Sequence, residues 1–112
     1  MSTPDILSIL LAVVMARAGW LNLTAPDFIR AEFRAWGYSE RLRIGVGVLE
    51  WIAAAALLIP SLRPIGCAIA VIVLLGVIAT LWRHREFMRV EYPALLLAVT
   101  LLTAAHAWGW FA

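Results

Sequence analysis

Glu50 and Arg17 are the side chains with the greatest capacity for chemistry, because each interrupts a long apolar run. Glu50 is the sole charge in residues 44–60, and Arg17 is the sole charge in residues 6–23. A charge inside a membrane helix is costly and needs either a partner or a task. We therefore predict both as candidate catalytic residues, with Glu50 as acid or base and Arg17 as the cation that holds an oxyanion or keeps Glu50 ionised.

The positions of the two residues predict a matched depth. Arg17 lies six residues before the end of the first apolar run at Leu23. Glu50 lies seven residues after Arg43, which opens the second run. At about 1.5 Å per helical residue, both lie roughly 10 Å below the same boundary. An Arg17–Glu50 ion pair between antiparallel helices is therefore expected.

Two structural interpretations of this pair stand beside the chemical one. A buried ion pair can fix the register of two helices without any reaction. Alternatively, Arg17 extends its guanidinium to the membrane boundary and leaves Glu50 protonated within the bundle.

The residues near Glu50 are those expected to line a pocket for a ligand. Arg43, Gly47 and Glu50 share one helical face, and Gly47 leaves room beside the carboxylate. Trp51 lies deep in the run although tryptophan prefers the membrane boundary, which suggests a pocket wall. The predicted lining residues are Trp20, Asn22, Gly47, Trp51 and Thr80.

Cofactor and metal ligands are scarce in the sequence. His106 is one further candidate, and it is separated from His84 by 22 positions, which places them near opposite membrane faces. Thr80 is expected to bond its own helix backbone. We predict no metal site and no evident cofactor; a quinone or another lipophile is the ligand class that the pocket would take.

The composition is that of a membrane protein. The chain has 112 residues, of which 64% are hydrophobic, and its mean hydropathy is +0.93. Soluble domains contain about 45–50% apolar residues. The nine basic residues are all arginines interleaved with acids, so no basic stripe indicates a nucleic-acid partner. Cys67 is the single cysteine, which excludes an intrachain disulfide and a cysteine-based metal site.

The hydropathy pattern predicts an all-α membrane protein with one domain, residues 1–112, built as a four-transmembrane-helix bundle. The expected spans are 5–23, 43–60, 65–82 and 93–111, each about the length that crosses a bilayer. The first run is read as a retained helix rather than a cleaved signal, because Asp5 and no basic residue precede it. A short amphipathic helix is expected at 26–36, with Thr24 or Asp27 as its cap and Gly37 at its end.

Arginine distribution predicts the orientation and location of the protein. The first and third connectors hold seven arginines, whereas the second holds Arg63 alone. The arginine-rich connectors are therefore expected in the cytoplasm of a bacterium, with both termini outside the inner membrane. Expected partners are the lipid bilayer, a second or third copy in a homodimer or trimer, and a partner protein. The seven arginines are Arg30, Arg34, Arg41, Arg43, Arg83, Arg85 and Arg89.

Short motifs in this order resemble the DoxX-like family of small four-helix integral membrane proteins. The motifs are Gly19-x-x-Asn22-Leu23-Thr24-x-Pro26, Trp36-Gly37-Tyr38, Ile44-Gly45-x-x-x-Leu49-Glu50 and Leu58-Ile59-Pro60. The resemblance places Glu50 at the family's acidic position. It also shows departures: Asn22 and Ser39 stand where the family often has Lys and Pro, and Arg17 is the residue that would replace the lysine.

The resemblance implies a link to membrane redox systems. Members are associated with thiosulfate–quinone oxidoreduction, with membrane redox complexes and, in animals, with receptor assembly. We predict a non-catalytic membrane subunit or assembly module, associated with a redox or quinone system. The alternative is a membrane-embedded enzyme or binder that acts on a lipophilic small molecule through Glu50 and Arg17.

Overall fold

The computed structural model describes residues 2–109 of the chain, and its regular structure over these residues is entirely helical. Short 3-10 helices, η1 and η2, precede α4 and α5. The elements are α1 (Thr3–Thr24), α2 (Asp27–Ala35), α3 (Glu40–Leu57), η1 (Pro60–Leu62), α4 (Arg63–Arg83), η2 (Phe87–Val90) and α5 (Glu91–Ala107).

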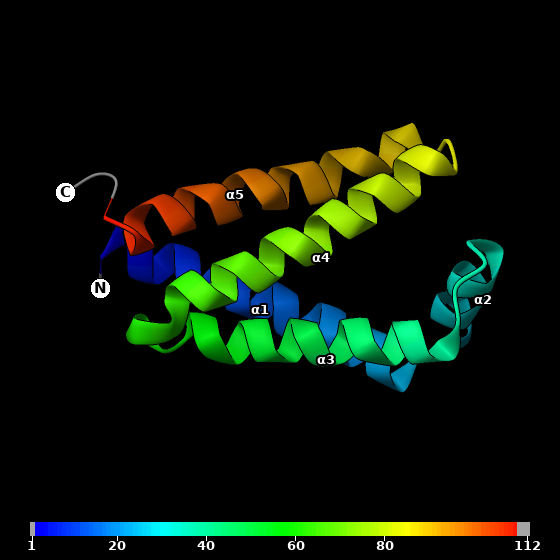
Figure 1. Ribbon diagram of the computed structural model, residues 1–112, viewed down its shortest axis with the longest axis horizontal. Coiled ribbons are helices and arrows are strands. Elements are labelled where there is room, and N and C mark those ends of the chain that lie inside the picture. Colours follow the sequence, from blue (N-terminus) through cyan, green and yellow to red (C-terminus); the bar gives the residue numbers. More distant parts are fainter. Residues whose placement is uncertain (1, 110–112) are drawn as a thin grey trace.

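Four long helices form a bundle, and the short helix α2 lies across one end of it (Figure 1). Helix α1 contacts α3 and α5, and α4 contacts α3 and α5, so the four close into a ring. Helix α1 begins and α5 ends at the end opposite to α2 (Figure 1). The connectors that carry most of the arginines are therefore together at the α2 end.

Local sequence explains where these helices start and stop. Ser2 and Asp5 form a capping box at the start of α1, and the Ser39 hydroxyl accepts the Leu42 N–H at the start of α3. Gly37, with φ of 79°, follows α2 in the left-handed region that favours glycine.

The predicted side-chain cap of α2 is wrong. Pro26 occupies the cap position, and no side chain caps the helix. Thr24 instead donates its hydroxyl to the Trp20 carbonyl, 2.7 Å away in α1, and Asp27 is the first residue of α2. Proline suits this position because the first N–H groups of a helix lack partners within it.

Three helical segments of the described chain are long and apolar enough to cross a membrane: Thr3–Thr24, Pro60–Arg83 and Phe87–Ala107. Helix α3 is not among them, because Glu40, Arg41, Arg43 and Glu50 all fall within its 18 residues. The expected amphipathic segment 26–36 corresponds to α2. The fourth expected span, 93–111, corresponds to α5, and residues 110–111 lie outside the described residues.

Two glycines lie where α1 and α3 approach each other closely, and neither position has room for a methyl group. A methyl group on Gly19 would clash with Cδ1 of Trp51 and would lie 2.9 Å from the carbonyl oxygen of Gly47. A methyl group on Gly47 would lie 2.8 Å from Cγ of Leu23. Small residues at a helix interface allow the backbones to approach closely, which is a main source of attraction between membrane helices.

Helices α3 and α4 meet at one end and diverge toward the other. A methyl group on Gly66, near η1, would lie 3.0 Å from the Leu57 amide nitrogen and 3.1 Å from the Ala53 carbonyl oxygen. A methyl group on Gly76, nearly three turns further along α4, would meet nothing within 4 Å. Figure 1 shows the same divergence, with α2 beyond the open end.

We expect Gly19→Ala to destabilise the bundle by about 1–3 kcal/mol, because the added methyl group clashes with both a ring and a backbone oxygen. Gly45→Ala is the control: its methyl group would meet nothing within 4 Å, so we expect a change below about 1 kcal/mol. Unfolding in mixed micelles, followed by circular dichroism, measures both. Equal stability of the two variants would contradict the close contact.

Candidate functional site

Glu50 is buried in the contact between α1 and α3, with 5% of its surface exposed. The side-chain amide of Asn22 on α1 donates a hydrogen bond of 2.5 Å to its carboxylate. The backbone carbonyl of Asn22 in turn accepts a hydrogen bond from the guanidinium of Arg43, which is also buried. Asn22 therefore joins the two buried charges of α3 to the end of α1.

The predicted ion pair between Arg17 and Glu50 is wrong. Arg17 is exposed, and within residues 2–109 neither a salt bridge nor a hydrogen bond joins it to Glu50. The cause is helical geometry. Gly19 and Asn22 face α3, whereas Arg17 precedes Gly19 by two positions, about 200° around the helix. The exposed side chain fits the interpretation in which Arg17 extends away from the bundle.

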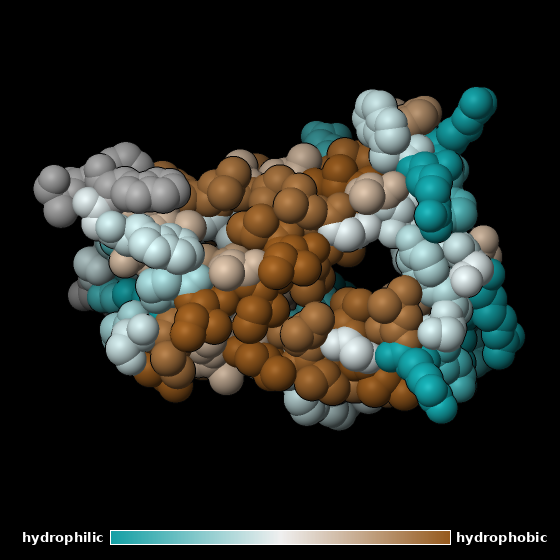
Figure 2. All heavy atoms as spheres, in the orientation of Figure 1, coloured by the Kyte–Doolittle hydropathy of each residue, from teal (hydrophilic) through white to brown (hydrophobic). Residues whose placement is uncertain are grey.

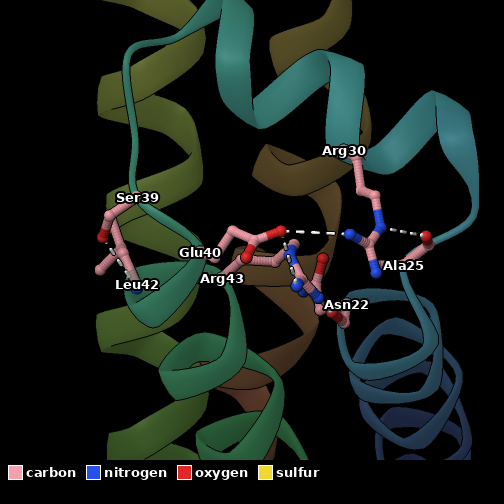
Figure 3. Close-up of polar contacts among 7 residues, drawn as sticks. All are labelled: Asn22, Ala25, Arg30, Ser39, Glu40, Leu42 and Arg43. Carbon is pink, nitrogen blue, oxygen red and sulfur yellow. Dashed lines mark hydrogen bonds and ion pairs between the residues drawn. The ribbon is translucent and has the colours of Figure 1, made fainter.

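Arg43 belongs to a polar network that sequence reasoning missed (Figure 3). Its guanidinium lies 3.8 Å from the carboxylate of Glu40, which also pairs with Arg30 at 3.1 Å. Arg30 donates a further hydrogen bond of 3.0 Å to the carbonyl of Ala25. The network links the end of α1, α2 and the start of α3. The signal for it was the shared helical face of Arg43 and Glu50, two turns apart.

Side chains of α1 occupy the space that the sequence predicted to be open beside Glu50. The space beside Gly47 is filled by Leu23 and Asn22 of α1. Trp51 is 44% exposed on the outside of the bundle, and its indole N–H donates a hydrogen bond of 3.1 Å to the carbonyl of Ala16. Trp20 stacks on it with ring centroids 6.4 Å apart and is itself exposed. These two rings cover the outer edge of the α1–α3 contact.

A cavity of about 480 Å³ lies elsewhere, where α3 and α4 diverge. Figure 2 shows the hollow between hydrophobic surfaces, with paler and polar residues toward α2. Of the predicted lining residues, Thr80 contributes to it, whereas Trp20, Asn22, Gly47 and Trp51 do not. The apolar walls include Leu42, Val46 and Leu49 of α3, and Ile72, Val73 and Val77 of α4.

The polar groups of this cavity are gathered at its α2 end. Tyr38 and Thr80 share a hydrogen bond of 2.7 Å between their hydroxyl groups. Thr80 also donates to the carbonyl of Gly76 at 2.8 Å, which confirms the expected bond to its own helix. Because Thr80 uses its proton there, Tyr38 is the donor between the hydroxyls. Arg83 donates to the Tyr38 oxygen at 3.3 Å.

Family comparison agrees with the motifs. The sequence model of the DoxX-like family matches residues 6–103. The chain belongs to the DoxX-like family. Neither the curated proteins nor the solved structures gave a match. In this DoxX-like protein, the motif residues Gly19, Asn22 and Glu50 meet at one place, the α1–α3 contact.

The remaining candidates of this DoxX-like protein lie apart from that contact. His106 is in the last turn of α5, at the end of the bundle opposite to α2. Within the described residues, no cluster of three or more His, Cys, Asp or Glu side chains could hold a metal ion.

Contacts to the α4–α5 connector hold α2 in place. Trp36, which follows α2, donates its indole N–H to Glu86 at 2.9 Å, and Arg89 donates to the same carboxylate at 2.7 Å. Arg89 also pairs with Glu32 of α2. The Trp36 hydrogen bond and the Arg89 guanidinium hold the pKa of the Glu86 carboxyl below its ordinary value of 4.5.

We expect Asn22→Leu to destabilise the DoxX-like protein by about 3 kcal/mol, because it leaves the buried Glu50 carboxyl without its donor. The double variant Asn22→Leu with Glu50→Leu should recover most of this loss, since both polar partners are then replaced by apolar groups. Glu50→Gln keeps an acceptor for Asn22 and should change stability by less than about 1 kcal/mol. Unfolding in mixed micelles tests all three; additive losses in the double variant would contradict the coupling.

Docking of α2 should depend on pH through Glu86. Because its pKa is lowered in the folded protein, its contribution is complete above the ordinary value of 4.5 and is lost as the pH falls through the lower folded value. We expect the wild type to have a higher Tm than Glu86→Gln at pH 7, and the difference to shrink at a pH below 4.5, as the Glu86 carboxyl becomes protonated. Thermal unfolding in detergent at both pH values measures this.

Trp36→Phe is the companion variant for this experiment. It keeps a ring but removes the indole donor to Glu86, so the pH-dependent difference should shrink. A difference in Tm between the wild type and Glu86→Gln that is the same at both pH values would contradict the role of the charge.

Proposed function

We propose that this DoxX-like protein is a non-catalytic membrane subunit or assembly module of the bacterial inner membrane, associated with a redox or quinone system. One observation supports the non-catalytic reading above the others. Glu50 is buried against α1, is bonded to Asn22, and is not among the residues that line the cavity between α3 and α4. A general acid or base must come within hydrogen-bond reach of its substrate. The family resemblance supports the redox association.

We propose α3 as the fourth membrane span of the bundle. It packs along α1 and α4, both of which contain segments apolar enough to cross the membrane. Its inward charges Arg43 and Glu50 are buried against α1 and hydrogen-bonded, which lowers the cost of placing them in a bilayer. Four spans place both ends of the chain outside and the arginine-rich connectors in the cytoplasm.

We propose that the module works as an assembly, either as a homodimer or trimer or with a partner protein. Many large apolar side chains are exposed on the helices, among them Leu10, Val13, Ile72 and Leu95. Lipid can cover these faces, and so can a second membrane protein that packs against them.

The alternative is a membrane-embedded enzyme or binder for a lipophilic molecule that uses Glu50 with Arg17. Its support is the cost of keeping a carboxylate inside the bundle. It requires α1 and α3 to separate near Gly47, because Leu23 and Asn22 fill that space. It also requires Arg17 to turn toward the contact.

Native electrophoresis of membranes solubilised in mild detergent separates the two functions. We expect the tagged protein to migrate in a complex whose other chain mass spectrometry identifies, and Arg17→Gln with Glu50→Gln to migrate in the same complex. The wild-type protein migrating alone as a monomer would contradict the module. A lipophile that copurifies with the wild type, and is lost in a folded Glu50→Gln variant, would establish the alternative.

A further inference from the structure

We propose that the cavity between α2, α3 and α4 binds an anionic amphiphile, a single apolar molecule that ends in a carboxylate or phosphate. This site goes beyond the proposed membrane module and does not use Glu50 or Arg17. Its volume of about 480 Å³ lies within the range of about 300–1,000 Å³ that is typical of small-molecule pockets.

The body of the cavity selects an apolar ligand. Its α3 and α4 walls are aliphatic over most of their length, with Leu49 and Ile72 exposed toward the surroundings of the bundle. Ile72 lies 11 residues from Arg83 on the same helix, which is about 16 Å along the axis. Gly76 lies between them and keeps the floor open, since even an added methyl group there would meet nothing within 4 Å. A chain-like molecule therefore has a continuous apolar path along α4.

The polar end of the cavity selects an acceptor. The hydrogen bonds run in one direction: Arg83 donates to Tyr38, Tyr38 donates to Thr80, and Thr80 donates to the carbonyl of Gly76. Both hydroxyl protons are thereby used within the protein. Arg83 has five N–H donors and uses one of them in this series of hydrogen bonds. The group that completes this end of the site is therefore an acceptor rather than a donor.

Charge makes that acceptor an anion. Four arginines each pair with a carboxylate among residues 2–109: Arg30, Arg43, Arg63 and Arg89. The other arginines in this range do not, and Arg83 is the one of these that lines the cavity. Arg83 has no carboxylate within salt-bridge distance among residues 2–109, and its guanidinium lies 5.8 Å from the centre of the Tyr38 ring. Arginine binds carboxylate and phosphate through paired N–H donors. Its position at the last residue of α4 suits a headgroup at the boundary of the membrane.

The experiment uses cis-parinaric acid, a fluorescent fatty acid, with the full chain in detergent. We expect saturable fluorescence at one molecule per chain, and displacement by palmitate but not by hexadecanol. Gly76→Leu fills the floor of the cavity and should weaken binding at least tenfold. Gly45→Leu is the control, because Gly45 faces open space and does not line the cavity. Arg83→Gln should also weaken binding at least tenfold and abolish the preference for palmitate.

The competitors distinguish the two sources of the anion. Displacement by palmitate but not by phosphatidylglycerol identifies a free fatty acid as the ligand, and displacement by both identifies a site that a bilayer phospholipid also fills; both results agree with the proposal. Equal binding by Gly76→Leu and wild type would overturn the cavity as the site. Equal displacement by hexadecanol and palmitate would overturn the recognition of an anion. Absence of saturable binding to a folded wild-type protein would overturn the proposal as a whole.

Discussion

The close approach of α1 and α3 is the contact on which the rest of the structure depends. Membrane helices gain little from the hydrophobic effect, so their attraction comes from close packing and from polar bonds between them. Gly19 and Gly47 supply the packing, because neither position has room for a methyl group. The Asn22–Glu50 hydrogen bond supplies the polar link one turn away. Together they fix both the distance and the register of the two helices.

This contact also explains why the cavity lies where it does. The face of α3 that carries Gly47 and Glu50 packs against α1, so the adjacent face with Val46 and Leu49, about 100° around the helix, is left to line the gap toward α4. Near η1 the two helices touch through Gly66, but further along α4 departs from α3. The buried polar cluster and the cavity are thus separate features on two sides of one helix.

The sequence predicted the helical class well, and the partners of its buried charges poorly. Long apolar runs have one structural solution in lipid, so the helices and the family could be recognised from pattern alone. The partner of Glu50 depends on the rotation of α1 about its axis, which is set by Gly19 and is not readable from depth. The position of Arg17 along the helix favoured it as the partner of Glu50, whereas the rotation of α1 about its axis turns Asn22 toward Glu50 instead. The cavity was missed because it arises from the angle between α3 and α4, to which no single residue type points.

Because α3 and α4 diverge, α2 connects their separated ends. Helices α3 and α4 are in close contact near η1 and separate toward the other end, where α2 lies between them. The Arg30–Glu40 ion pair joins α2 to the start of α3. The indole N–H of Trp36, which follows α2, donates a hydrogen bond to Glu86, which follows α4. A displacement of α2 would therefore change the width of the gap between α3 and α4.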